Sequence, residues 1–313
     1  MTNRVRVAVA TALWLTAFAA FASWAEAQGN GRGHAYGKRN QGASGGGAAA
    51  GAAAGAPSGS SPTDASQGQP VGVGVRNFGA WLDDASMMTP GSGSLTLSFA
   101  YWRTPAYREF DVPVVDGNLG LARRVQFGFS VPYYHANEPG GPIARGVGDL
   151  YLTTKIQLRE PSSKDGRLGF AVTPLLEVLS YAPARSRVSW ALPANLEWRG
   201  EGWRAFGSAG YFSRGAVFGS GALEIAISDS AWLTGSISES YSLERDDFST
   251  ALGLARSRMD VSGGAGLSLA PNIAIFGVVG RTISKQDVNS ATFFLTSGVS
   301  VSFDAPPPAK PRR

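Results

Sequence analysis

The sequence predicts an all-β protein, in which residues 94–303 form a transmembrane antiparallel up-and-down β-barrel of about twelve strands. Three observations lead to this prediction. From Ser94 onward, apolar and polar residues alternate with a period of two, as they do in half-buried strands. The polar face of these segments consists mostly of Ser, Thr, Gly, Ala and Gln. Glycine is abundant, with 41 residues, whereas charged residues make up only 16% of the chain.

The alternation is clear in the segment VGDLYLTTKIQLR, which spans residues 147–159. Its leucine and isoleucine side chains share one face, and the other face carries Asp149, Lys155 and Arg159 among uncharged polar residues. A soluble β-sandwich also alternates, but its polar face meets bulk water and is usually dense in Lys, Glu and Asp. The sparse charge and small residues here are instead typical of a confined, wet barrel lumen.

The pattern also predicts how the strands follow one another along the chain. We expect strands near residues 94–103, 107–121, 123–134, 147–159, 167–179, 188–198, 203–212, 217–227, 231–242, 258–269, 273–284 and 291–303. Because the number of strands is even, the first strand begins and the last strand ends on the same side of the membrane. If the first strand leaves the periplasm, the turns at 122–123, 160–166, 199–202, 228–230 and 270–272 face the periplasm. The longest connections, 135–146, 180–187, 243–257 and 285–290, then face outward, as in outer-membrane barrels.

Aromatic residues and two irregularities add detail to this barrel. Tyr and Trp residues cluster toward the predicted strand ends, which is typical of the girdles at a membrane interface. An ordinary sandwich core is the alternative interpretation of these aromatic residues. The apolar phase slips near Val114 and Val115, which predicts a β-bulge. Glu239 falls on the apolar face of its strand, near the outer end.

The segments outside the barrel have compositions of their own. Residues 1–27 are expected to form a cleaved signal peptide, with Arg4 and Arg6 before an apolar run and a small-residue cleavage site ending at Ala27. Residues 28–70 are a Gly/Ala-rich segment that we expect to be a disordered periplasmic linker. Residues 71–93 are a more apolar lead-in that could pack under or inside the barrel. Residues 304–313 form a proline-rich basic tail.

The composition limits the chemistry of the chain. Without cysteine it has no disulfide or thiolate metal site, and with two histidines a His-rich metal centre is improbable, so we expect no metal and no cofactor. The net charge of +5 is dispersed, and we expect no nucleic-acid partner. One enzymatic alternative is a barrel lipid hydrolase that uses His135 in an outer loop as a base. The predicted barrel, residues 94–303, lacks a G-x-S-x-G motif, and we expect no catalytic residues.

Charged residues on the predicted inner face are the candidate site of this barrel. Seven residues are expected to line the lumen: Asp149, Lys155, Arg159, Glu177, Glu197, Arg204 and Glu224. One interpretation is an electrostatic lining that selects or orients a solute. The other is a set of internal ion pairs that fill a narrow barrel, because twelve strands give an interior between that of small filled barrels and that of open porins. The sequence leaves both interpretations open.

Several segments resemble a known family of outer-membrane barrels. The matching pieces are PGSGSLTLSFAYWR, DVPVVDGNLGLARRVQFGFSVPYY, GVGDLYLTTKIQLRE, SWALPANLEW, GALEIAISDSAWLTGSIS and LSLAPNIAIFGVVGR, within roughly Pro90 to Phe303. They resemble the family named for the meta-pathway of phenol degradation, whose members are described as transporters. The Gly/Ala linker and the basic tail depart from its pattern.

The resemblance implies an outer-membrane location in a Gram-negative cell and passage of small, often hydrophobic or aromatic solutes. The expected partners are outer-membrane lipid and lipopolysaccharide, the small-molecule solute and the barrel-assembly machinery. A structural or surface-interaction barrel that transports nothing is the alternative.

Overall fold

The computed structural model describes residues 82–137, 144–163, 166–178, 188–244, 253–288 and 290–303. The expected signal peptide, the linker, residues 71–81 of the lead-in and the C-terminal tail lie outside these residues. The described chain contains the strands β1 (Gly93–Arg103), β2 (Arg108–Ala122), β3 (Val125–Asn137), β4 (Ala144–Val147), β5 (Leu150–Arg159), β6 (Gly169–Val172), β7 (Leu175–Val178), β8 (Val188–Gly200), β9 (Trp203–Phe212), β10 (Ala216–Ser228), β11 (Ala231–Ser242), β12 (Ser257–Ala270), β13 (Ile273–Thr282) and β14 (Phe293–Phe303). None of the described residues belongs to a helix long and apolar enough to cross a membrane.

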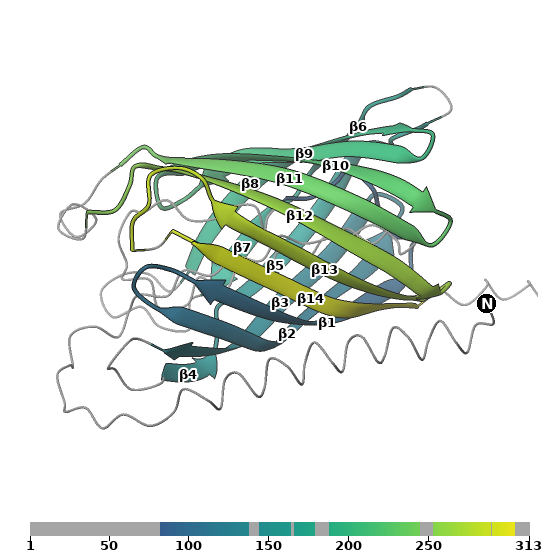
Figure 1. Ribbon diagram of the computed structural model, residues 1–313. Coiled ribbons are helices and arrows are strands. Elements are labelled where there is room, and N and C mark those ends of the chain that lie inside the picture. The colour runs from purple at the N-terminus through teal and green to yellow at the C-terminus, as the bar shows by residue number, and fades with distance from the viewer. Residues whose placement is uncertain are drawn as a thin grey trace, which may run out of the picture.

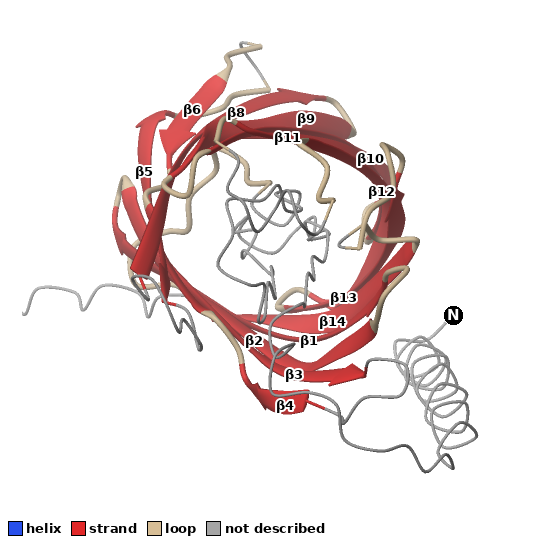
Figure 2. Ribbon diagram, turned by 90° about the vertical axis from the view of Figure 1, so that its left-hand side faces the viewer, coloured by secondary structure: helices blue, strands red, loops and turns tan. Residues whose placement is uncertain are grey.

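All of these strands belong to one antiparallel sheet that closes on itself (Figure 2). The seam joins β1 to β14, from the pair Gly93 and Phe303 to the pair Arg103 and Phe293. The segments β4 and β5 both pair with β3, and β6 and β7 both pair with β5 and β8. The segments β4 and β5 therefore form one interrupted strand, and β6 and β7 form another. Counted in this way, the described residues form a closed barrel of twelve strands. This confirms the fold class predicted from the sequence.

The two interruptions correct the prediction of continuous strands at 147–159 and 167–179. Between β6 and β7 the chain contains Pro174, which has no backbone N–H and cannot donate to the ladder. Its carbonyl oxygen still accepts a hydrogen bond from the backbone N–H of Thr154, at 3.0 Å. Between β4 and β5, the N–H of Gly148 donates to the carbonyl oxygen of Pro132 at 2.8 Å. These contacts keep each interrupted strand in place against its neighbours.

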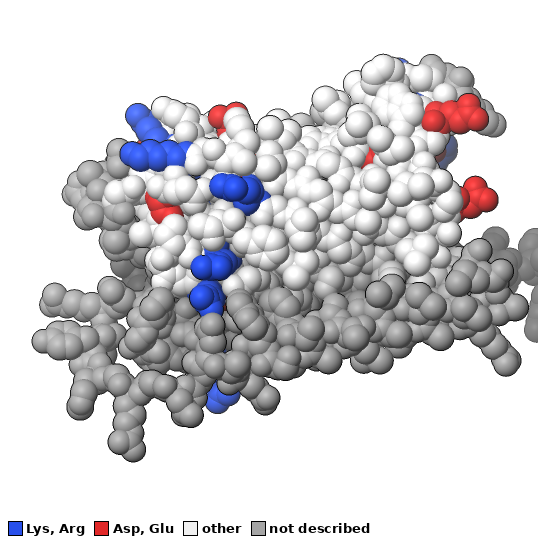
Figure 3. All heavy atoms as spheres, viewed as in Figure 1, with Lys and Arg blue, Asp and Glu red and all other residues white. Residues whose placement is uncertain are grey.

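The barrel is apolar outside and polar inside. On β8 the exposed side chains include Trp190, Leu192 and Trp198, whereas Asn195 and Glu197 on the opposite face are buried. Figure 3 shows the same arrangement on one side of the molecule, where charged side chains gather toward the two ends of the wall and the middle is free of them. A soluble protein would show the reverse pattern, so this surface is suited to lipid.

The predicted β-bulge is present on β2. The register with β3 shifts between Asp111 and Val114. Before the shift the buried residues of β2 are Glu109 and Asp111, and after it they are Val114 and Asp116. One extra residue thus moves the inward face from odd to even positions, which is why the apolar phase of the sequence slips here.

The connections differ between the two ends of the barrel. The turns of β2–β3, β8–β9, β10–β11 and β12–β13 are each two residues long, and they lie at the end where β1 begins and β14 finishes (Figure 1). We call this the short-turn end and the opposite one the loop end. The connections at residues 138–143, 179–187 and 245–252 of the loop end fall outside the described residues. That the short-turn end faces the periplasm remains a prediction.

Candidate functional site: the barrel lumen and its plug

Residues 82–92, which precede β1, lie inside the barrel, and we call this segment the plug. Leu82, Ala85 and Met88 are almost completely buried, with exposed fractions of 2%, 0% and 1%. Leu82 packs against Phe206 and Ala222, which point inward from β9 and β10. The sequence left open whether residues 71–93 pack under or inside the barrel, and the described part of this segment lies inside it.

Two acidic residues of the plug meet two basic residues of the wall. Nζ of Lys155 on β5 lies 2.7 Å from Oδ1 of Asp83 and 3.2 Å from Oδ1 of Asp84. It also donates to the carbonyl oxygen of Ser86 at 3.3 Å, so all three ammonium hydrogens have an acceptor. Nη1 of Arg204 on β9 lies 2.8 Å from Oδ2 of Asp84. Both acids are thus neutralised inside the barrel by cations of the wall.

Arg204 also connects Asp84 of the plug to two carboxylates of the wall, those of Glu224 and Glu197. Its Nε and Nη2 donate to Oε1 and Oε2 of Glu224, at 2.8 and 3.0 Å, in a bidentate pair. Its Nη1 lies 3.8 Å from Oε1 of Glu197. Glu197 in turn accepts a hydrogen bond from the hydroxyl of Ser86 at 2.6 Å and pairs with Arg199 at 2.5 Å. The network therefore runs from the plug into three neighbouring strands.

Uncharged side chains hold the plug backbone in addition. The backbone N–H of Met88 donates to Oε1 of Gln126 at 3.0 Å, and Nε2 of Gln157 donates to the carbonyl oxygen of Ala85 at 2.6 Å. Buried backbone groups need such partners because an unpaired one costs about 1–3 kcal/mol. These contacts fix the position of the plug as well as its charge.

The charge state of Asp84 follows from this network. Burial alone would raise the pKa of Asp84, but the attraction of Lys155 and Arg204, together with the backbone N–H of Ser86, outweighs it. The pKa of Asp84 is therefore below its ordinary value of 3.8, and the carboxyl group is ionised at neutral pH.

The structure brings four of the seven predicted lumen residues together at the plug, namely Lys155, Glu197, Arg204 and Glu224. Two others lie nearer the loop end. Glu177 is fully buried and accepts a hydrogen bond from the hydroxyl of Tyr151 at 3.1 Å, and Asp149 is also buried. Arg159 is exposed at the end of β5. Of the two interpretations left open, internal ion pairing describes the four residues at the plug.

The sequence did not single out Asp83 and Asp84. The signal that was available is the adjacent acidic pair in an otherwise apolar stretch, GAWLDDASMM. Two neighbouring carboxylates among apolar residues need cations when they are buried. Nothing local in the sequence shows that Lys155, 72 positions from Asp83, is one of them.

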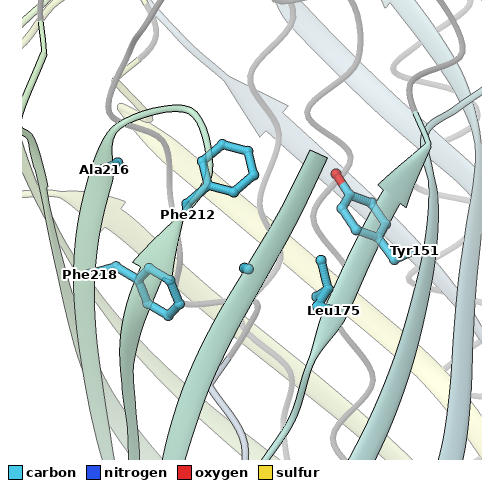
Figure 4. Packing of buried hydrophobic residues seen from close by; sticks show 6 residues of the cluster. Tyr151, Leu175, Phe212, Ala216 and Phe218 are labelled. Atoms are coloured by element: carbon cyan, nitrogen blue, oxygen red, sulfur yellow. The ribbon is translucent and has the colours of Figure 1, made fainter. Parts of the chain in front are cut away.

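Nearer the loop end, the inner wall carries two apolar patches. The first consists of Tyr151, Leu175, Ala191, Phe212, Ala216 and Phe218, which come from neighbouring strands of the sheet (Figure 4). The second is built around Trp102 of β1 and Phe294 of β14, whose rings stack with centroids 5.2 Å apart, together with Tyr107, Val278 and Ala291. The first patch is centred on β8 and the second on β14, which lie half a turn of the barrel apart. The two patches therefore face each other across the lumen.

Two residues that the sequence raised lie on the outer wall. Glu239 is exposed and lines a shallow groove of about 460 Å³ over β10, β11 and β12, beside Ile237 and Tyr241. His135 points outward from β3, with its ring centroid 5.2 Å from that of Tyr133. Neither side chain belongs to the lumen network described above.

A closed antiparallel sheet with an apolar outer wall and a polar interior defines a transmembrane β-barrel of the outer-membrane type. The structure is similar to the crystal structure of an outer membrane channel from Pseudomonas putida F1, with a TM-score of 0.54 and 14% sequence identity, over 70% of this chain and 98% of that one. The NanC porin gives a TM-score of 0.49 at 10% identity, over 66% of this chain and 98% of that one. The CymD monoaromatic hydrocarbon channel gives 0.37 at 8% identity, over 69% and 88% of the two chains.

At 14% identity the first likeness concerns the fold alone. No protein-family model matches the chain, and no curated protein matches its sequence.

Proposed function

We propose that the chain is an outer-membrane channel of the transporter type for small solutes, including hydrophobic and aromatic ones, in a Gram-negative cell. In this proposal residues 1–27 are a cleaved signal peptide, and the chain is related to the barrels of the meta-pathway of phenol degradation. The observation that carries the proposal is the pair of apolar patches that face each other inside an otherwise polar lumen. Phe212 and Phe218 on one side, and Trp102 and Phe294 on the other, are aromatic side chains on the inner wall, where a water-filled pore would need none.

The plug gives this channel a closed state. In this proposal the plug, which is held by Lys155 and Arg204, closes the short-turn half of the lumen and moves when a solute passes. A solute that enters from the loop end meets the two apolar patches before it meets the plug. We therefore propose a gated, substrate-selective channel in place of a permanently open pore.

The lipid partner is a further part of the proposal. Arg103, Arg256, Arg281 and Lys285 are exposed at or near the loop ends of β1, β12 and β13. Cations at this level suit the phosphate groups of lipopolysaccharide in the outer leaflet. We propose lipopolysaccharide as the lipid around this end, and the barrel-assembly machinery as the partner that inserts the chain.

The proposal can be tested by uptake of benzyl alcohol into porin-deficient Gram-negative cells that express the full chain. The lipopolysaccharide leaflet slows the entry of apolar solutes, so a channel raises the initial rate. We expect Phe218→Ser, which makes the inner wall polar, to lower this rate severalfold. The matched variant Val217→Ser changes the adjacent, outward-facing residue of β10 and leaves the rate unchanged. An uptake rate equal to that of cells without the chain would contradict the proposal.

The seated plug also favours a second candidate, a structural or surface-interaction barrel that transports nothing. In that case the plug stabilises the barrel permanently, and variants that release it gain no uptake. Capture of a periplasmic partner that depends on residues 28–70 would then support this second function.

A further inference from the structure

The carboxylate of Asp83, in the plug, is held by three side chains of the barrel wall. Nζ of Lys155 on β5 donates to Oδ1 at 2.7 Å. The hydroxyl of Thr173 and Nδ2 of Asn195 both donate to Oδ2, each at 3.3 Å. We call Lys155, Thr173 and Asn195 the carboxylate cradle. The wall therefore supplies a donor to each of the two oxygens of one carboxylate.

The two uncharged donors of the carboxylate cradle are positioned by contacts within the wall. Thr173 lies at the interruption between β6 and β7, and its backbone N–H donates to the carbonyl oxygen of Pro193 on β8 at 3.0 Å. Nδ2 of Asn195, also on β8, donates to the hydroxyl of Thr173 at 2.7 Å. Neither contact involves the plug. The donors therefore remain in place when the plug moves away, so that little ordering is needed to bind another carboxylate.

The charge of the wall also calls for an anion at this place. Lys155 is 3% exposed, and its carboxylate partners among the described residues, Asp83 and Asp84, both belong to the plug. The wall carboxylates of the network, those of Glu197 and Glu224, pair with arginine side chains instead. A buried ammonium group without a counter-ion is costly. Lys155 therefore needs a new anionic partner whenever the plug leaves.

The arrangement of the donors decides which kind of anion fits. Lys155 serves one oxygen of the carboxylate of Asp83, and Thr173 and Asn195 serve the other. A carboxylate group of a small solute can reproduce both sets of hydrogen bonds and the charge. An alcohol has a single oxygen and no charge, so it cannot replace Asp83.

We propose that the carboxylate cradle is a binding site for small solutes that carry a carboxylate group, and that Asp83 occupies it while the plug is in place. The solute and Asp83 then compete for the same donors. Because the solute binds only the barrel from which Asp83 has withdrawn, its binding shifts the equilibrium toward the released plug. This inference rests on the proposed function, since it names a solute class of the same lumen and the event that moves the plug.

Benzoate is the probe that tests this site, and benzyl alcohol is its neutral counterpart. Binding to the full chain in detergent is measured by ligand-observed NMR. The variant Lys155→Met removes the cation of the carboxylate cradle. We expect it to bind benzoate about tenfold or more weakly, whereas its affinity for benzyl alcohol changes by less than about twofold. Thr173→Val, which removes one uncharged donor, should weaken benzoate binding by a smaller factor.

Removal of the competing carboxylates should have the opposite effect. The double variant Asp83→Asn and Asp84→Asn keeps the carboxylate cradle and takes away the charges that occupy it, so we expect it to bind benzoate several times more tightly than the unaltered chain. Gly120→Ala should act in the same direction, because it places a Cβ atom against the plug backbone at Thr89. It decides the question if the double variant does not fold. If the ion pair only stabilised the barrel, loss of either partner would not strengthen benzoate binding.

The competition has a second readout in the unaltered chain. Benzoate should speed the cleavage of the plug by chymotrypsin, whereas benzyl alcohol should not. The matched control is Lys285→Met, which removes an exposed cation and should bind benzoate as the unaltered chain does. Retention of the folded barrel is checked by heat-modifiable migration on gels.

The outcomes separate the site from the channel. Equal affinity for benzoate in the unaltered chain and in the Lys155 and Asp83 variants would overturn the inference, even if benzyl alcohol is taken up by cells that express the chain. Benzoate binding that depends on Lys155, without uptake of either compound, would support the site while contradicting the proposed channel.

Discussion

Nζ of Lys155 lies 2.7 Å from Oδ1 of Asp83, although 72 positions separate the two residues in the chain. This contact joins the barrel wall to the plug, and Asp84 extends it to Arg204. Both side chains of the pair are less than a tenth exposed, so solvent screens their attraction only weakly. Several of the contacts that hold the plug in the barrel are therefore ion pairs, and each charge can be changed separately.

Replacement of Lys155 by Met should release the plug. The substitution keeps the length of the side chain but leaves Asp83 and Asp84 without their shared cation. Removal of one partner of a buried pair costs about 3–5 kcal/mol, and movement of the acidic plug into water relieves this cost. We expect a higher single-channel conductance in planar bilayers. Lys285→Met, at an exposed loop position, is the control, and equal conductance of the two variants would refute the role of Lys155.

Acidification should release the plug as well. The pKa of Asp84 is lowered in the folded state, so its contribution to stability is complete above its ordinary pKa of 3.8 and is lost as the pH falls below it. The charged wall groups that act on Asp84 are Lys155, Arg204, Glu197 and Glu224. We expect conductance to rise as the pH is lowered below 3.8 and to fall again on neutralisation.

The variant Asp84→Asn should conduct at neutral pH and respond less to acid. Equal conductance of Asp84→Asn and the unaltered chain at neutral pH would show that other contacts hold the plug.

A methyl group at Gly120 should displace the plug without any change of charge. A Cβ atom at this position of β2 would lie 2.2 Å from the carbonyl oxygen of Thr89, which is a backbone atom of the plug. A Cβ atom at Gly219, on the outer wall, would meet nothing within 4 Å. We expect Gly120→Ala to raise conductance and Gly219→Ala to leave it unchanged. Chymotrypsin should then cut the plug near Leu82 or Met88 in the first variant only.

The outer wall of β8 gives a test of the membrane-facing surface. Trp190 and Trp198 are exposed near its two ends, and Ala194 lies midway between them on the same face. Ala194→Arg should lower the free energy of unfolding in lipid vesicles by about 2–4 kcal/mol, because it places a cation at the middle of the apolar band. Ala194→Leu should be nearly neutral. Urea titrations of both variants measure the difference, and equal stabilities would place this face outside the lipid.

The sequence predicted the strands of the barrel wall well. In each strand, apolar residues alternate with polar ones, and this alternation shows which side chains face outward and which face the lumen. The expected strands at 203–212 and 231–242 match β9 and β11 at both ends, and the phase slip near Val114 marks the bulge. The interruption at Pro174 was missed, although proline is a local signal, because the apolar alternation continues across it.

The plug network could not be predicted in the same way. The pairing of Asp83 with Lys155 depends on which strand of the wall lies against the plug. The periodicity of the sequence carries no information about this contact. The four lumen charges at the plug were identified because an inward charge on an alternating strand is visible locally. Their partners were not identified, because the partners belong to a segment without regular structure.

The seam between β1 and β14 has a consequence for the assembly of the barrel. Thr96 and Ser300, which are hydrogen-bonded across it, are 204 positions apart, so the chain gains this contact only after nearly all other strands are in place. We expect closure to be the last and slowest step of folding, because a non-local pairing must meet its loop-closure entropy before it gains contacts. A chain that is stalled before β14 pairs would expose two unpaired strand edges to its neighbours, and the completed seam between β1 and β14 removes them.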